Sequence, residues 1–142
     1  MGNELLTGII TKLRDTFGYD TTIYLDEVKQ ELQEPCFFVR ILEVSQEPGL
    51  DNRYRRKYFL DIEYHCDEDV QTARKFADVA NTLLMAVEYI YMGDDLVRGT
   101  GIHYEVQDNV LHFFINYDFF VFRVPDEVPY METLTQRGNL KG

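Results

Sequence analysis

The sequence predicts an α+β fold, with a single, mainly antiparallel β-sheet and two helices packed on one of its faces. Three observations favour this class. Two segments repeat apolar residues every three or four positions, as amphipathic helices do. Several others are rich in aromatic and β-branched residues, as strands are. Turn sequences separate neighbouring strands, which favours antiparallel pairing. The predicted order is α-β-β-β-α-β-β-tail, with a single α+β domain over residues 1–124 and an extended C-terminal arm over residues 125–142.

The first third of the chain predicts one helix and two strands. The helix ends before Gly18, and its apolar residues share one face. A short β-prone run at residues 22–25 and an acidic, polar stretch precede a strand over residues 36–44. This strand is apolar on both faces, which is typical of a sheet interior. Residues 46–52 contain Pro-Gly and Asp-Asn and predict a loop. The apolar face of the helix consists of Leu5, Leu6, Ile9, Ile10, Leu13 and Phe17.

A long strand with strict alternation is predicted over residues 53–65. One face is apolar. The other is charged, with Phe59 as its apolar exception, and we expect that face to meet water. The apolar face holds Tyr54, Tyr58, Leu60, Ile62 and Tyr64, and the charged face holds Arg53, Arg55, Lys57, Asp61, Glu63 and His65.

The second helix and a hairpin follow. Acidic residues 67–69 suit the start of the helix, and residues 92–95 end it. Strands 102–107 and 111–121 flank Asp108-Asn109, which fits a two-residue turn. That turn would place Val106 opposite Leu111, Tyr104 opposite Phe113 and Ile102 opposite Ile115. The helical stripe consists of Ala73, Phe76, Ala77, Ala80, Leu83, Leu84, Val87 and Ile90.

Length and charge limit the class of protein. The chain has 142 residues, 45% of them hydrophobic, which suits one globular domain. A net charge of −11 repels nucleic-acid phosphates at long range and opposes self-association except through local complementarity. No stretch reaches the ~18–20 apolar residues that cross a bilayer. The start lacks a secretory signal, so we expect folding in a cytoplasm.

The sequence lacks a specific catalytic motif, and we predict neither an enzyme nor a bound cofactor. Residues 99–101, Gly-Thr-Gly, lack the following helix of a phosphate-binding loop and predict a turn. There is no nucleophile elbow and no His-Glu-x-x-His. Asp94-Asp95 and the acidic residues 67 and 69 suit a turn and a helix start. Cys36 and Cys66 lack metal or redox spacing and predict buried, reduced thiols.

Histidines provide the one candidate metal site. In the predicted hairpin register His112 lies opposite Glu105, with His103 diagonal to it on the same face. Two imidazoles and a carboxylate can hold a metal or relay a proton. The favoured interpretation is a set of surface side chains on the wet face, and no metal site is predicted. The run 65–67, His-Cys-Asp, diverges on a strand and cannot easily converge on one ion.

A basic run stands out in this acidic chain. Four of the 14 cations fall within five residues, at Arg53, Arg55, Arg56 and Lys57, with a tyrosine interleaved. One interpretation is a contact with an acidic protein surface or with nucleic acid, of which the protein is favoured by the negative net charge. The other is a solvated strand edge that blocks aggregation. The sequence leaves both open.

Four segments are spread in order across nearly the whole domain. They are Pro35-Cys36-Phe37-Phe38, residues 52–56 (Asn-Arg-Tyr-Arg-Arg) running on to 59–64 (Phe-Leu-Asp-Ile-Glu-Tyr), residues 96–99 (Leu-Val-Arg-Gly), and residues 110–114 (Val-Leu-His-Phe-Phe) running on to Tyr117-Asp118. Each segment alone is weak, because Phe-rich strands are common, whereas their combination is specific. Together, and in matching order, they resemble the tail terminator proteins of tailed phages and of phage-tail-like particles from Gram-positive bacteria.

The resemblance implies a structural protein without catalytic residues. Such a protein forms a ring, usually a hexamer, on the head-proximal end of the tail tube, where it stops tube growth. Its partners are the tail tube protein and a neck or head completion protein, or the last sheath layer. The lack of a long apolar run and the negative net charge predict no membrane and no specific nucleic acid among the partners, and the lumen of such a ring leaves room for DNA to pass. It places the protein in the tail of a virion or tail-like particle, assembled in the host bacterial cytoplasm.

Two hypotheses about surfaces follow. The basic run and the preceding residues 47–52 face either the lumen or the tube. Part of the C-terminal arm lies against a neighbouring subunit. Three alternatives remain, namely another neck or head-tail joining adaptor, a small metal-binding module, and a nucleic-acid-binding module. The arm residues proposed for the subunit interface are Val128, Pro129, Tyr130, Met131 and Leu134.

Overall fold

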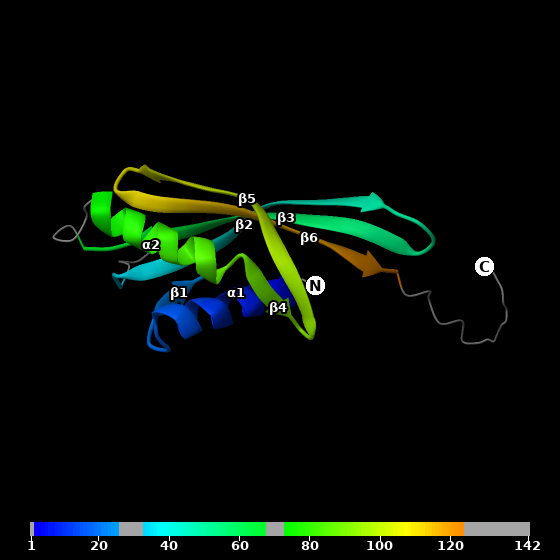
Figure 1. Cartoon of the computed structure of the whole chain (residues 1–142), viewed down its shortest axis with the longest axis horizontal. Helices are drawn as coiled ribbons and strands as arrows, with labels where there is room; N and C mark the ends of the chain where they lie inside the picture. Colours follow the sequence, from blue (N-terminus) through cyan, green and yellow to red (C-terminus); the bar gives the residue numbers. More distant parts are fainter. Residues whose placement is uncertain (1, 26–32, 68–72, 124–142) are drawn as a thin grey trace.

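The protein is described here by a computed structural model, which covers residues 2–25, 33–67 and 73–123. These residues form two helices and a six-stranded sheet (Figure 1). The predicted C-terminal arm lies outside the described residues. The elements are α1 (Gly2–Phe17), β1 (Thr22–Tyr24), β2 (Cys36–Pro48), β3 (Arg53–His65), α2 (Ala73–Ala86), β4 (Tyr89–Met92), β5 (Asp95–Gln107) and β6 (Val110–Phe122).

The predicted fold class is confirmed. The strand order is β1-β2-β3-β6-β5-β4, so the hairpin β2–β3 and the hairpin β5–β6 join where β3 pairs with β6. Every pairing is antiparallel except β1 with β2, which is parallel. The structure contains one strand, β4, that was not predicted from the sequence.

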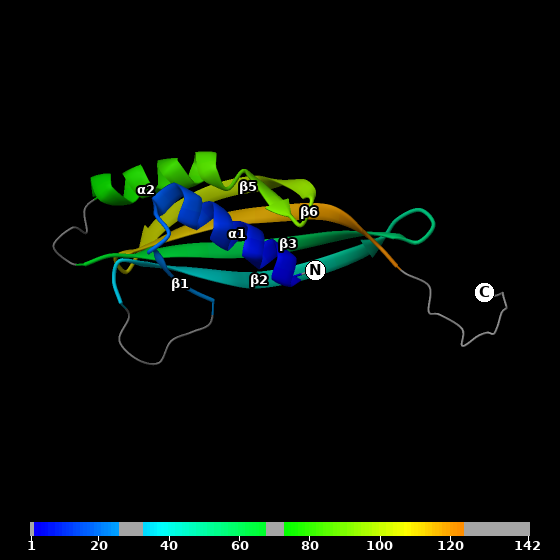
Figure 2. The same cartoon turned by 90° about the horizontal axis from the view of Figure 1, so that it is seen from below.

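Both helices cover the same face of the sheet, and the core lies between (Figures 1 and 2). From α1 it receives Leu5, Ile9 and Leu13, which follow each other at four-residue spacing and are fully buried. Full burial of an aliphatic side chain contributes about 1.5–3 kcal/mol. The sheet contributes residues of one parity from each central strand, as the alternation predicts. These are Tyr58, Leu60, Ile62 and Tyr64 of β3 and Leu111, Phe113, Ile115 and Tyr117 of β6.

The predicted end of the second helix is wrong. The helix ends at Ala86, and the chain turns into β4, where Tyr89 and Tyr91 are exposed while Ile90 is buried. Ile90 fits both a helical stripe and a strand alternation, so periodicity alone could not decide. The tyrosines on either side favour the strand. The predicted helix end at residues 92–95 is instead the β4–β5 turn, with Gly93 at a φ of 66°.

The predicted loop after β2 is also partly wrong, because the strand continues to Pro48. A bulge between Ile41 and Glu43 changes which face the following side chains occupy. Beyond it the strand is not a sheet interior, since Leu42 and Val44 are 48% and 51% exposed. The interpretation of β2 as a sheet-interior strand therefore holds only for its first half, which lies beside β1 and beneath the helices.

The hairpin β5–β6 confirms most of the predicted register. Val106 pairs with Leu111, and Tyr104 pairs with Phe113. The two turn residues, Asp108 and Asn109, have φ values of 54° and 62°, the left-handed geometry of a type I′ turn. The predicted pairing of residue 102 with residue 115 falls within a register shift between residues 100 and 103 and stays a prediction. The shift contains a glycine at position 101 with a φ of 60°.

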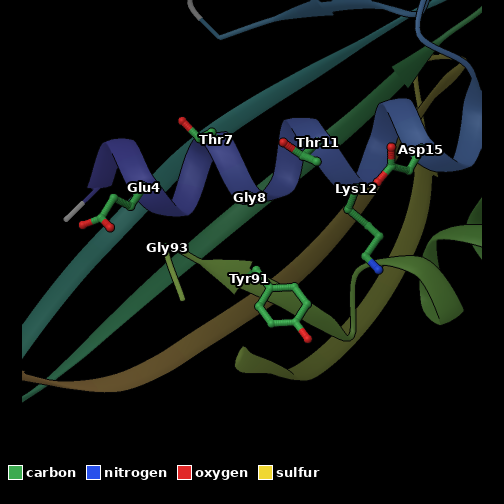
Figure 3. A pocket seen from close by; sticks show the side chains of 8 residues that line it. All are labelled: Glu4, Thr7, Gly8, Thr11, Lys12, Asp15, Tyr91 and Gly93. Carbon is green, nitrogen blue, oxygen red and sulfur yellow. The ribbon is translucent and has the colours of Figure 1, made fainter. Parts of the chain in front are cut away.

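The contact between α1 and β4 depends on a glycine. Gly8 lies on the turn of α1 that faces β4 (Figure 3), and a Cβ added there would overlap the carbonyl oxygen of Tyr91. The clash is with the backbone, so no side-chain rotation can relieve it. Gly8 therefore sets how closely the helix approaches the strand.

We predict that Gly8→Ala destabilises the fold by about 1–3 kcal/mol, the usual cost of overpacking a close contact. Helix propensity alone would act in the opposite direction, since alanine favours helices over glycine. Thr11→Ala, at an exposed position on the same helix, should change stability by less than about 0.5 kcal/mol. Chemical denaturation of the two variants measures the difference. Equal stability of Gly8→Ala and the parent would contradict the close contact.

Candidate functional site

Half of the sheet projects beyond both helices (Figures 1 and 2). This half, here called the distal ribbon, consists of residues 42–48 of β2, 53–57 of β3 and 118–122 of β6. It forms because β3 pairs with β6 along its length, from Arg53 with Phe122 to Tyr64 with Leu111. The core strands thus continue into the ribbon without interruption.

Both long edges of the distal ribbon lack a strand partner among the described residues. On one side, β1 pairs only with Cys36–Phe38, which leaves the rest of the β2 edge open. On the other side, the pairing of β5 with β6 stops at Tyr117, so residues 118–122 are open. Open edges present unpaired N–H and C=O groups, which are a template for adding another strand.

The distal ribbon also exposes large apolar side chains. Phe120 and Phe122 of β6 are 52% and 64% exposed, in addition to Leu42 and Val44 of β2. The register places Phe120 and Phe122 beside Arg55 and Arg53, on the face away from the helices, and Val44 beside Tyr58 on the helix side. Each face of the projecting element therefore carries exposed apolar side chains that a partner can cover.

The basic run is divided between the two faces of the ribbon. Strand alternation places Arg56 on the helix side with Tyr54 and Tyr58, and Arg53, Arg55 and Lys57 on the opposite side. The four cations therefore do not form one continuous patch.

Three of these cations have partners within the chain. The Arg55 guanidinium binds Asp118, with Nε 2.9 Å from Oδ1, and this pairing raises the pKa of Arg55. Arg56 donates from Nε to Oε1 of Gln46 at 2.9 Å. These contacts occupy much of the hydrogen-bonding capacity that phosphate recognition would need.

Arg53 makes a different contact. Its guanidinium carbon lies 4.7 Å from the centre of the Phe120 ring, which is a cation–π geometry. The contact holds the exposed ring in one orientation and covers part of it. The basic run thus links neighbouring strands of the ribbon through side-chain contacts and also adds positive charge to it.

The charge of the ribbon differs from that of the rest of the chain. It contains the four basic residues of the run against the acids Glu43, Glu47 and Asp118, a net of 4 − 3 = +1. The remainder of the chain therefore carries −11 − 1 = −12. A ribbon of this charge is attracted to the acidic body of a neighbouring molecule.

The predicted wet face of β3 is wrong at two residues, because Asp61 and Glu63 are buried, at 5% and 4% exposure. They lie on the sheet face opposite the helices. Neighbouring side chains provide partners, with Arg40 Nη2 2.9 Å from Glu63 Oε2 in an ion pair and His65 Nε2 3.1 Å from Glu63 Oε1 in a hydrogen bond. The carboxylates are therefore held in a network rather than in water.

His112 belongs to this network and not to the triad considered from the sequence. The predicted opposition of Glu105 and His112 is confirmed, but Nδ1 of His112 lies 2.9 Å from Oδ2 of Asp61 on β3. His103 instead contacts the carbonyl of Gly101 on its own strand, at 3.0 Å from Nδ1. The alternation of β3 placed both acids on one face, and the missing information was that β6 pairs with β3.

Burial raises the pKa of Asp61 to about 6, and the nearby Glu63 charge acts in the same direction, while the contact with His112 opposes it. Burial likewise raises the pKa of the Cys36 thiol to about 11, so that it stays protonated at neutral pH. The prediction that both cysteines are reduced and buried is confirmed.

The other predicted site residues are not brought together. The arm residues 128–131 and 134, and Asp69, lie outside the described residues. Cys66 is part of the core under the helices, whereas His65 contacts Glu63 on the opposite face, so the run 65–67 diverges as expected. A groove beside α1 has a volume of about 540 Å³ and is lined by Glu4, Thr7, Gly8, Thr11, Lys12, Asp15, Tyr91 and Gly93 (Figure 3).

A projecting ribbon with open edges and exposed aromatic residues is typical of a subunit that assembles with other proteins. The family model described as phage tail terminator protein matches residues 4–129. The chain belongs to this family, and is thus a structural component of a phage tail rather than a member of an enzyme family. A comparison with curated proteins found no match. Within the described residues, neither helix has the length and apolar character that a membrane span requires.

Proposed function

We propose that this chain is a tail terminator subunit that assembles into a ring, expected to be a hexamer, on the head-proximal end of a tail tube. The ring stops tube growth and joins the tube to a neck or head protein or to the terminal sheath layer. Assembly takes place in the host bacterial cytoplasm. Family membership supports the role, and the observation that carries the assembly mechanism is the distal ribbon.

A ring needs a heterologous interface, in which one surface of a subunit meets a different surface of the next. The ribbon suits this role because its charge of +1 complements a body of −12. Its edges can add to a neighbouring sheet, and its apolar side chains gain by burial. The repulsion between acidic bodies falls with salt, since the Debye length is about 8 Å at 0.15 M. We therefore expect rings to form more readily at moderate salt than at low salt.

Leu42 tests the role of the ribbon in assembly. Leu42→Glu places a charge on an exposed apolar position of β2 and should weaken ring formation at least ~10-fold, because an interface does not readily bury an unpaired carboxylate. Met85→Glu is the matched control, since Met85 is an exposed apolar residue of α2, away from the ribbon. Native mass spectrometry over a range of protein concentrations measures the subunit number. The ribbon would lose its assigned role if both variants formed rings like the parent.

A ring seen only with tubes present would show that the tube end templates assembly, and the same variants are then compared on tubes.

We also propose that the basic run and the preceding residues 47–52 face the tube or its lumen. Reversing Arg55 and Arg56 to Glu should reduce co-sedimentation with purified tubes at least ~10-fold, because each change replaces an attraction by a repulsion. Reversing Arg74 and Lys75 of α2 makes the same change in net charge away from the ribbon. Undiminished tube binding by the Arg55/Arg56 variant would refute this orientation. Binding to heads in place of tubes would indicate a neck adaptor.

We also propose that residues 128–134 of the C-terminal arm lie against a neighbouring subunit. Ending the chain before Pro125 should leave the thermal midpoint of the monomer nearly unchanged, because the sheet and both helices lie before that point. The same truncation should shift the oligomer distribution toward monomer. Analytical ultracentrifugation of the truncated and full chains measures the shift. Rings of unchanged stability would show that the arm makes no essential subunit contact.

A further inference from the structure

The network on the open face of the sheet brings three metal-binding side chains together. Asp61 and Glu63 are two residues apart on β3 and share a face, and His112 of β6 pairs directly with Glu63 in the register. One ligand atom from each side chain lies within 4.8 Å of the other two. The geometry results from β3 and β6, the two paired strands that supply much of the core.

A second observation points to a ligand. The Asp61 side chain is only 7% exposed, and its Oδ1 atom is buried without a hydrogen-bond partner among the described residues. Its Oδ2 atom is the one that faces His112, at 2.9 Å. A buried carboxylate oxygen without a donor is costly, and such groups in native proteins call for an explanation such as a bound ion.

The surroundings support ion binding. Arg40 contacts Oε2 of Glu63 at 2.9 Å and His65 contacts Oε1 at 3.1 Å, and the two side chains so orient that carboxylate, with Oε2 facing both Arg40 and His112. Outer hydrogen bonds of this kind fix ligands in metal sites. His112 retains 22% exposure of its side chain, which leaves a path for an ion and for a water ligand.

We propose that Asp61, Glu63 and His112 form a binding site for one divalent first-row transition ion, with Zn²⁺ as the reference ion and water as the fourth ligand. Mixed imidazole and carboxylate donors suit such an ion better than Mg²⁺ or Ca²⁺, which prefer oxygen alone. The Nδ1 atom of His112 binds the ion in its unprotonated form. The ion thus replaces the contact between His112 and Asp61, and any proton on Nδ1 is released to solvent.

The required movement is small. Tetrahedral ligation at about 2.1 Å places ligand atoms about 3.4 Å apart. Nδ1 of His112 is already 2.9 Å from Asp61 and 3.9 Å from Oε2 of Glu63. All three ligand atoms lie within 4.8 Å of one another, so closing the site requires side-chain adjustments of about 1 Å. The site is independent of ring formation, so either proposal can fail without the other.

The test is a calorimetric titration of untagged, chelator-treated protein with ZnCl₂ at pH 7, repeated with CoCl₂ to record the visible absorption of the bound ion. We expect one ion per chain and no displacement by excess Mg²⁺. His112→Gln keeps an N–H donor for Asp61 but removes the imidazole ligand, and should weaken binding at least ~10-fold. His103→Gln is the matched control, because His103 is a histidine of the neighbouring strand outside the cluster, and should bind as the parent does.

Circular dichroism of the chelator-treated variants checks that each is folded. If His112→Gln does not fold, the imidazole NMR signals of the parent protein test the site instead. Zn²⁺ must then shift the signal of His112 and leave that of His103 unchanged. The proposal is overturned if the parent binds no Zn²⁺ at micromolar concentration. It is equally overturned if His112→Gln binds as tightly as the parent, or if His103→Gln is the variant that loses binding.

Discussion

The pairing of β3 with β6 is the interaction on which the rest of the structure depends. It joins two hairpins that are far apart in sequence, and it supplies the central strands of the core. The same two strands then leave the helices and form the middle and one edge of the distal ribbon. A single register therefore aligns the apolar core face, the charged network of the opposite face, and the projecting surface.

Local patterns predicted much of this fold because the responsible interactions are local. Four-residue spacing identified α1, and Asp108-Asn109 identified the tight hairpin turn, since both depend on neighbouring residues. The errors arise where two patterns coincide or where a distant strand decides. Ile90 satisfied both a helical and a strand period, and the bulge after Ile41 left no signal in the alternation. Full pairing of β2 up to Pro48 depends on β3 opposite it, which composition does not reveal.

The candidate site was accessible to sequence only in part. The basic run is visible as a string of cations, but its partners Gln46 and Asp118 lie on two other strands, so the contacts of Arg56 and Arg55 are a tertiary property. The buried network shows the same limit. Charged residues at alternate positions of a strand normally face water, and here Arg40 and His112 from neighbouring strands cover and partner them. The resemblance to a known family added what neither pattern gave, namely that the chain belongs to a family of phage tail components.

The continuity of β3 through core and ribbon has a mechanical consequence. Hydrogen bonds between antiparallel strands lie perpendicular to the strand direction. A force applied to the ribbon tip along β3 therefore loads the pairings with β6 together, from Arg53 to Tyr64, instead of opening them one after another. Shear of this kind resists separation better than peeling does. If the distal ribbon binds a neighbouring subunit, as proposed, one continuous strand carries load from that contact directly into the core of the subunit.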